Sequence, residues 1–405
     1  MEKCEELLLD ALRCAIHDRT VDWSEEIDAE TRGALVRLAR SQSVLPLLVQ
    51  SLGSAVSLFG ERERDSLLYT AKRLTLSQAA RTASFLVLLE ELSGRGVHPL
   101  VLKGLVCRDL YPEPEQRAST DEDLLISTTE FPRCHEAMLS CGLKLLKSYD
   151  SPVEEDEVTY VSSEWDLYIE LHTKLFPGDS DLFSACNDLF AEALERRVSQ
   201  EIYGCSVVSL HPTDHLLYML CHAYKHLLFG GVGIRQICDI CLFARRYDAD
   251  IEWERLRAST ERIGIQVLSA AFFLIGERHL QLPAPEAFAD LKPDELPLLG
   301  DSLSGGLFGV DDLDRLHSSR ITLDAAAADN ERRRPRGLIA SVFPSKAYLM
   351  QSFPYLREKP WLLPAAWGHR IWRYLSRGST SPARSLQIGR ERVELLKQYN
   401  VISGK

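Results

Sequence analysis

Three carboxylates occupy positions that could bind a divalent metal ion. Asp121 and Asp123 are two residues apart in DEDLLIS (121–127), whose apolar character predicts a buried strand. Side chains alternate between the two faces of a strand, so both aspartates are expected to share one face. Glu170 lies on the polar side of the alternating segment EWDLYIELHTKLF (164–176). If these two strands are neighbours, the three carboxylates converge, and Mg²⁺ prefers oxygen ligands of this kind.

A glycine turn precedes the carboxylates in the chain. Lys103 and Gly104 follow the apolar segment VHPLVL (97–102) and lead into a short helix. Glycine allows backbone N–H groups to approach a phosphate closely, and a helix N-terminus favours an anion. Two metal ions about 3.5–4 Å apart, bridged by aspartates, are a common device for phosphoryl and nucleotidyl transfer. The sequence therefore predicts a site for a nucleotide and metal ions.

Further polar side chains lie on predicted helices near the middle of the chain. His222 and His226 are four residues apart and share a helix face. They either face a ligand or pack at a helix interface. Arg235 and Asp239 have the same spacing, which is consistent with an intrahelical ion pair or with a phosphate contact by Arg235.

The elements around these residues predict an α+β protein. A small mixed β-sheet core at 96–210 is flanked by helical regions at 1–95 and 211–405. Helical periodicity is seen at 31–52, 74–92, 129–142, 194–200 and in several segments after 212, and strands are expected at 97–102, 121–127, 143–150, 157–163 and 164–176.

Composition excludes some functions. The net charge is −12, which argues against a protein that binds bulk nucleic acid, because such binding relies on Lys and Arg. The run of arginines at 332–336 is expected to be a solvated loop. Apolar runs of the length of a membrane span and signal-peptide features are missing, so we expect a cytoplasmic protein. Its ten cysteines are expected to be reduced; Cys238 and Cys241 have C-x-x-C spacing, but no standard zinc pattern surrounds them.

The order of these motifs resembles a known family. A glycine turn, then a strand with Asp-x-Asp, and then a later strand with a single acidic residue is the order found in the DNA polymerase beta-like nucleotidyltransferase superfamily. The chain is most similar to a bacterial branch described as uncharacterised nucleotidyltransferases, and the resemblance covers most of residues 60–375. It is carried by VLKG (101–104), Tyr111, Arg117, DEDLLI (121–126), IELH (169–172), CHAYKHLLFGGVGIRQICDI (221–240) and FPSKAYL (343–349).

The resemblance implies an enzyme that binds an NTP with Mg²⁺, as two ions that Mn²⁺ could replace. A hydroxyl group of a small molecule, peptide, protein or RNA would accept the NMP group, and pyrophosphate would leave. Asp121, Asp123 and Glu170 would be the catalytic residues and metal ligands. The nucleotide contacts would be Lys103, Gly104, Arg117, His226 and Arg235.

Two residues depart from the family pattern. Leu105 follows Gly104 where the superfamily usually has serine or glycine, and Glu122 replaces an apolar residue between the two aspartates. Glu122 points away from the metal side, so it must reach solvent or find a partner, and Arg117 is the nearest cation in sequence. These departures motivate an alternative, a nucleotide-binding adaptor or sensor without catalysis. A helical interaction protein with incidental acidic residues is a third hypothesis.

Overall fold

The computed structural model describes residues 1–178, 181–305, 359–376 and 382–402, and positions 315, 318–319, 321–323, 325–326, 349 and 353–356. The arginine run at 332–336 and most of FPSKAYL lie outside the described residues. Among the described helices, none combines the length and the apolar character that a membrane span requires.

The N-terminal region is helical, as predicted, but its helices are divided differently. It contains α1 (Lys3–Ile16), α2 (Ala29–Ser41), α3 (Leu45–Leu52) and the long α4 (Glu61–Gly94). The single helix expected over 31–52 is broken after Ser41. Ser43 has a positive φ of 55°, and Pro46 lies in the first turn of α3. Proline cannot donate a backbone hydrogen bond in a helix interior, so it favours this break.

A mixed seven-stranded sheet forms the centre of the chain, which confirms the predicted α+β class. Its strand order is β3-β4-β5-β2-β1-β7-β6. Strand β2 is parallel to β5, and β1 is parallel to β7; the remaining pairs are antiparallel. The strands are β1 (Leu100–Val101), β2 (Glu122–Leu125), β3 (Lys144–Leu145), β4 (Glu157–Ser162), β5 (Leu167–His172), β6 (Val198–Ile202) and β7 (Cys205–Ser209).

The helix predicted over 194–200 is wrong. Part of this segment forms β6, which pairs with β7 in a tight hairpin. The two residues of the connection, Tyr203 and Gly204, both have positive φ, at 53° and 74°. This is the backbone conformation of a type I′ turn, which suits the twist of a hairpin. Tyrosine at the first turn position is not a usual hairpin signal, so the sequence pattern missed these two strands.

The remaining helices lie beside the sheet and after it. They are α5 (Lys103–Arg108), α6 (Phe131–Ser140), α7 (Asp181–Asp188), α8 (Pro212–Phe229), α9 (Ile234–Arg246), α10 (Trp253–Arg262), α11 (Gln266–Leu280), α12 (Leu296–Ser304), α16 (Leu363–Ser376) and α17 (Pro382–Gln398). Short 3-10 helices are η1 (Gly53–Leu58), η2 (Pro114–Gln116), η3 (Pro152–Glu154), η4 (Glu286–Phe288), η5 (Pro354–Leu356) and η6 (Pro360–Leu362).

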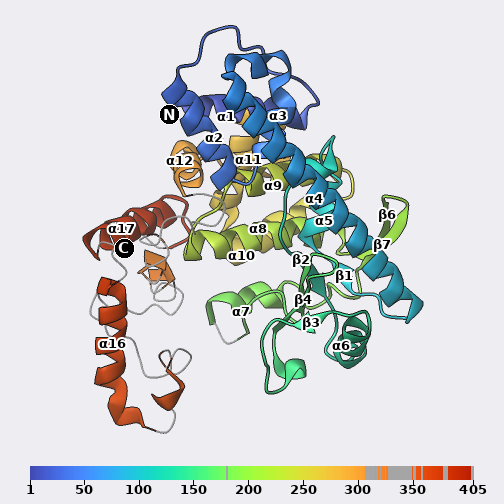
Figure 1. Ribbon diagram of the computed structural model, residues 1–405. Helices are drawn as coiled ribbons and strands as arrows, with labels where there is room; N and C mark the ends of the chain where they lie inside the picture. The colour runs from blue at the N-terminus through green and yellow to red at the C-terminus, as the bar shows by residue number, and fades with distance from the viewer. Residues whose placement is uncertain are drawn as a thin grey trace.

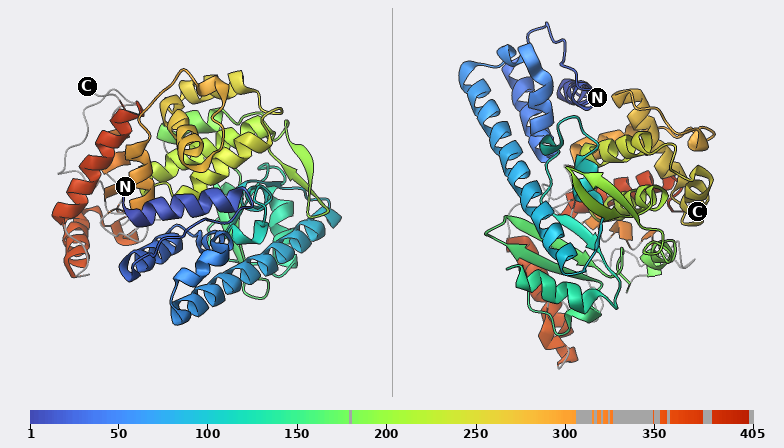
Figure 2. Two further views of the ribbon diagram at one scale, coloured as in Figure 1. Left: turned by 90° about the horizontal axis from the view of Figure 1, so that it is seen from above. Right: turned by 90° about the vertical axis from the view of Figure 1, so that its right-hand side faces the viewer.

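The helices enclose the sheet from two sides. Figure 1 shows α8 and α10 above the sheet and the N-terminal helices at the top of the molecule. In Figure 2, α4 runs along one side, and most of the helices after the sheet gather on the other. One hydrophobic core contains residues from the N-terminal helices, the sheet and the helices α8–α12. The division at 95 and 210 stays a prediction.

Candidate active site

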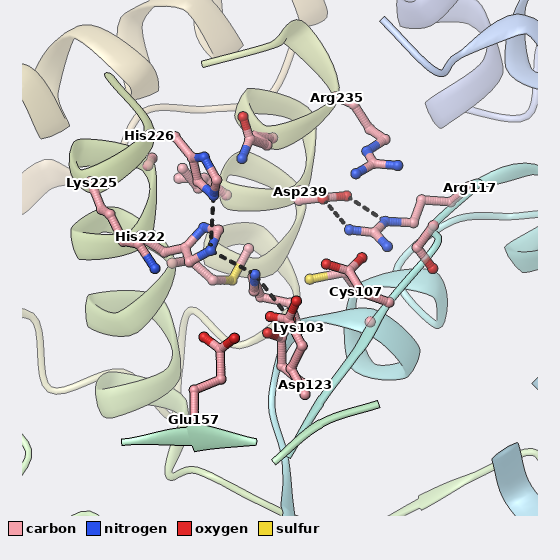
Figure 3. Close-up of a pocket in the computed structure, with 18 residues that line it drawn as sticks. Lys103, Cys107, Arg117, Asp123, Glu157, His222, Lys225, His226, Arg235 and Asp239 are labelled. Atoms are coloured by element: carbon pink, nitrogen blue, oxygen red, sulfur yellow. Dashed lines mark hydrogen bonds and ion pairs between the residues drawn. The ribbon is translucent and has the colours of Figure 1, made fainter. Parts of the chain in front are cut away.

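The sheet presents carboxylates to a pocket beneath helices α8 and α9. In the parallel pair of β2 and β5, Asp123 is the register partner of Glu170. Asp121 comes directly before β2, and Glu157 begins β4, on the other side of β5. All four acids line one pocket of about 310 Å³ (Figure 3). The three acids proposed from the sequence therefore share a pocket, and their role as metal ligands stays a prediction.

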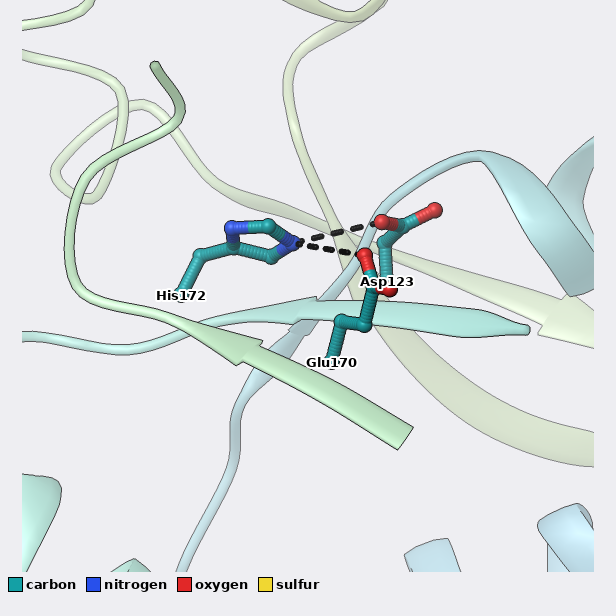
Figure 4. Close-up of side chains that lie close together, drawn as sticks. All are labelled: Asp123, Glu170 and His172. Atoms are coloured by element: carbon teal, nitrogen blue, oxygen red, sulfur yellow. Dashed lines mark hydrogen bonds and ion pairs between the residues drawn. The ribbon is translucent and has the colours of Figure 1, made fainter. Parts of the chain in front are cut away.

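The side chains that lie close enough together to share one metal ion differ from the predicted triad. Among the described residues, they are Asp123, Glu170 and His172, which each offer one ligand atom within 4.8 Å of the others. Figure 4 shows the imidazole of His172 directed at both carboxylates. Its Nε2 is 3.2 Å from Asp123 Oδ1 and 3.9 Å from Glu170 Oε2. Asp121 lies in the pocket but outside this cluster. His172 was missed, although the strand alternation placed it on the same face as Glu170.

The electrostatics of the cluster suit a bound cation. Burial raises the pKa of the Asp123 carboxyl, but the Lys103 ammonium and the His172 ring outweigh it and hold the pKa well below its usual range. Lys103 Nζ is 3.0 Å from Asp123 Oδ2. Burial, followed by repulsion from Asp123, Glu157 and Asp121, raises the pKa of Glu170 to about 8. A divalent ion would relieve this repulsion; carboxylates suit Mg²⁺ and Mn²⁺, and imidazole extends the choice to softer metals.

The turn before the carboxylates depends on glycine. Gly104 has φ 11° and ψ −101°, a non-helical conformation at the start of α5. A Cβ atom at this position would lie 2.1 Å from Glu122 Oε2. Because Oε2 also accepts a hydrogen bond from the backbone N–H of Leu105 at 3.1 Å, the carboxylate cannot move away freely. Glu122 thus holds the turn in place.

Glu122 has a dedicated partner, and that partner is Arg108. Arg108 Nη2 is 2.6 Å from Glu122 Oε1, and Arg108 Nη1 donates to Ser119 Oγ at 2.6 Å. Glu122 is 1% exposed and Arg108 is fully buried. Burial raises the pKa of Glu122, and Arg108 opposes this shift. Glu122, which departs from the family pattern, therefore forms a buried ion pair beneath the turn. Leu105, the other departure, places its side chain in the hydrophobic core.

Arg117, the other cation considered for Glu122, forms a separate buried pair. Its Nη2 is 2.6 Å from Asp239 Oδ2 on α9, and its Nε donates to Asp239 Oδ1 at 3.2 Å. The hydroxyl of Tyr111 donates to the same carboxylate at 2.8 Å. The predicted intrahelical pair of Arg235 with Asp239 is therefore wrong, because Asp239 extends from α9 toward Arg117 (Figure 3).

Arg235 carries a buried positive charge that is incompletely paired. It is 5% exposed, and one of its Nη atoms donates to the carbonyl of Ala118. Within the described part of the chain, Arg235 Nε and Arg117 Nη1 are buried without a hydrogen-bond partner. Burial and then repulsion from Arg117 lower the pKa of Arg235 to about 10. Both guanidinium groups line the pocket, where an anion could accept these unused N–H groups.

Helix α8 provides a second basic wall. His222, Lys225 and His226 line the pocket, opposite Arg117 and Arg235, with Lys103 and Asp123 between them (Figure 3). His222 Nε2 is 2.9 Å from Lys103 Nζ and 3.0 Å from His226 Nε2. Burial and then Lys103 lower the pKa of His226 to about 3, and they also depress the pKa of His222. Both imidazoles are therefore neutral at physiological pH, and His222 Nε2 can accept a hydrogen bond from the Lys103 ammonium.

The C-x-x-C pair does not contribute a metal site. Cys238 and Cys241 are buried free thiols on α9. In the part of the chain that the structure describes, no His, Cys, Asp or Glu cluster with metal-ligand spacing includes them. The pocket instead combines an acidic side from the sheet with basic side chains from α8, α9 and the segment before β2, so one cavity presents both carboxylates and cations.

The comparison with protein families agrees with this class of site. A family model described as "Uncharacterised nucleotidyltransferase" matches residues 28–280, more than half of the chain, and the chain belongs to this family. All residues that line the pocket fall within the match. The match begins earlier than the resemblance seen in the sequence and ends at the last residue of α11; the residues after 280 are called the C-terminal region below. No match was found among the curated proteins or the solved structures.

Proposed function

We propose that the protein is a Mg²⁺-dependent nucleotidyltransferase that moves an NMP group from an NTP to a hydroxyl acceptor. The observation that carries the proposal is the division of one pocket into an acidic and a basic part. Asp123 and Glu170 lie side by side on the sheet, and the buried cation Arg235 lies across the pocket with an unused N–H group. A nucleotide triphosphate with its metal ions needs both kinds of surface.

Asp123 and Glu170 would hold the metal ions, with His172 and Asp121 beside them. When bound, divalent ions neutralise charge on the phosphates and lower the pKa of an attacking hydroxyl. The acceptor oxygen would form a bond to the α-phosphorus, and the bond from the α-phosphorus to the bridging oxygen would break to release pyrophosphate. Glu170 would take the acceptor proton unless the metal ion occupies its carboxylate.

The basic groups would bind the phosphates. Lys103 extends from the glycine turn into the centre of the pocket, and Lys225 and His226 extend from α8 (Figure 3). Arg117 and Arg235 would supply the N–H groups that are unused in the protein itself. Gly104 lines the pocket, but Glu122 Oε2 takes the space that its missing side chain leaves and also binds the Leu105 N–H, so Lys103 would supply the phosphate contact at the turn.

The second candidate function is a nucleotide-binding adaptor or sensor without catalysis. The occupied N–H group of Leu105 favours it, since this amide is lost to phosphate binding. For either function the acceptor or partner is a small molecule, peptide, protein or RNA. The net charge of −12 makes bulk nucleic acid an unfavourable partner.

The test is a comparison of nucleotide binding with pyrophosphate release. Purified protein is titrated with each NTP in Mg²⁺, and pyrophosphate is then measured after cell extract is added as the source of acceptor. A nucleotidyltransferase binds one or more NTPs and releases pyrophosphate, and Asp123→Asn should reduce the release by on the order of 10²–10³. The exposed Asp150→Asn is the matched control and should behave as wild type. Tight NTP binding without release would indicate the adaptor, and no NTP binding would refute both functions.

A further inference from the structure

The helix that forms one basic wall of the pocket ends against the C-terminal region. Helix α8 carries His222, Lys225 and His226, and its last residue is Phe229. The final carbonyl groups of a helix have no partner within the helix, and they carry the negative end of its dipole. What binds these carbonyls therefore influences where the last turn of α8, and the side chains on it, are held.

Three side chains from distant positions bind carbonyls at this end. Arg392 of α17 donates to the carbonyl of Leu227, and Arg315 donates to that of Gly230. The hydroxyl of Thr322 donates to the carbonyl of Leu228 at 2.5 Å. Figure 1 shows α17 beside this end of α8. The acceptors follow His226 within four residues, so the contacts are adjacent to the pocket wall.

These contacts are built into the interior. Arg392 is 3% exposed, Thr322 is fully buried, and the Arg315 guanidinium pairs with Asp301 of α12. Arg392 Nη1 also approaches Ser318 Oγ at 3.4 Å. Cations near a helix C-terminus stabilise the dipole, and the effect is larger where the group is partly buried. All three donors lie after residue 280, where the family match ends.

We infer that the C-terminal region, through Arg392, Thr322 and Arg315, positions the α8 side chains that bind phosphate. Arg392, Thr322 and Arg315 act as positioning residues, through the carbonyls of α8, without contact with the ligand. The inference rests on the proposed function for its binding readout. It assigns to the part of the chain outside the family match a direct role in the geometry of the site.

Removing one of these donors should lower the affinity for NTP and leave the affinity for metal ions unchanged. The carboxylates proposed to bind metal lie on the sheet, and Lys225 and His226, which are proposed to bind phosphate, lie on α8. Arg392→Met should weaken NTP binding about tenfold, in line with a partly buried cation at a helix C-terminus. Binding of Mn²⁺ alone, measured by its electron paramagnetic resonance signal, should stay within about twofold of wild type. The matched control is Arg390→Met, an exposed arginine on the same helix, which should change neither affinity.

Two further measurements keep the test decisive. Thr322→Val removes one hydroxyl donor and keeps the shape of the side chain, and it should lower NTP affinity in the same direction by a smaller factor. The ring resonances of His222 and His226 should shift in Arg392→Met, whereas those of His135, which contacts Tyr160 away from α8, should not. This readout is independent of NTP binding, so it remains valid if the proposed function fails.

Unchanged NTP affinity together with unchanged ring resonances would overturn the inference. Equal losses of NTP and Mn²⁺ affinity would also overturn it, because they would indicate general damage to the fold. If wild-type protein fails to bind any NTP, the proposed function is refuted, and the ring resonances alone decide whether the C-terminal region positions α8.

Discussion

The buried pair of Glu122 and Arg108 gives the sharpest prediction for the glycine turn. Glu122→Gln keeps the shape of the side chain but removes the charge opposite a fully buried guanidinium. The glutamine oxygen can accept from Arg108 or from the Leu105 N–H, and its amide N–H₂ then faces the other donor. Breaking a buried ion pair by removing one partner costs about 3–5 kcal/mol. For a chain of 405 residues, that predicts a fall in melting temperature of roughly 4–6 °C.

Arg108 provides the second half of the test. Arg108→Met removes the cation, and the double substitution Glu122→Gln, Arg108→Met removes both charges. Changing both members of the pair to uncharged side chains of similar size avoids the unpaired buried charge that makes each single change costly. The double variant should therefore melt closer to wild type than the sum of the two single changes. Calorimetry of the four proteins, with the exposed Glu113→Gln as control, measures the coupling directly.

The same variants report on the turn. If Glu122 holds the turn, Glu122→Gln should weaken NTP binding, while Glu113→Gln should not. A wild-type melting temperature for Glu122→Gln, or simple additivity of the two single changes, would refute the idea that the Glu122–Arg108 pair holds the glycine turn in place. The turn would then have to be held by Gly104 and the buried Leu105 alone.

Three more predictions concern the pocket. Asp123→Asn or Asp121→Asn should reduce transfer by on the order of 10²–10³ with the fold retained, and a variant that releases pyrophosphate at the wild-type rate would remove that residue from the metal site. Lys103→Ala should weaken NTP binding by roughly 1.5–3 kcal/mol and leave nucleoside binding nearly unchanged, as paired titrations can show; equal losses for both ligands would indicate general damage to the pocket. In the presence of a metal chelator, the free energy of unfolding should fall as the pH rises from about 4.3 to 8. The pKa of Glu170 is raised to about 8 in the folded state, so over this range the folded protein keeps a proton that the unfolded chain has lost. Glu170→Gln should remove this part of the pH dependence of the melting temperature, and an unaltered profile would contradict the raised pKa.

Strand alternation was the most informative part of the sequence. It placed Glu170 and His172 on one face of β5, and the parallel register with β2 brings both of them to Asp123. The alternation rule reports which side chains share a face, and it needs no knowledge of the tertiary structure. The order of the glycine turn and the two acidic strands then indicated the family.

Partners that are distant in sequence could not be predicted in this way. Glu122 binds Arg108 across the turn, and Asp239 binds Arg117 from 122 positions away. Periodicity does not specify which elements pack together, so the nearest cation in sequence was the wrong partner for Glu122, and the nearest cation on α9 was the wrong partner for Asp239. The β6–β7 hairpin was missed for a related reason, because its turn residues carry a weak local signal.

The central claim is that an NMP group leaves the NTP and joins an acceptor. The most direct measurement follows the fate of two labels, one on the α-phosphorus and one on the γ-phosphorus, in reactions with the protein, Mg²⁺ and cell extract. We expect the α label to become attached to a hydroxyl acceptor and the γ label to be recovered in pyrophosphate, with both products reduced by on the order of 10²–10³ in Asp123→Asn. Transfer of the γ label to the acceptor would indicate a kinase, and an NTP that stays intact while tightly bound would indicate an adaptor; either result would contradict the account.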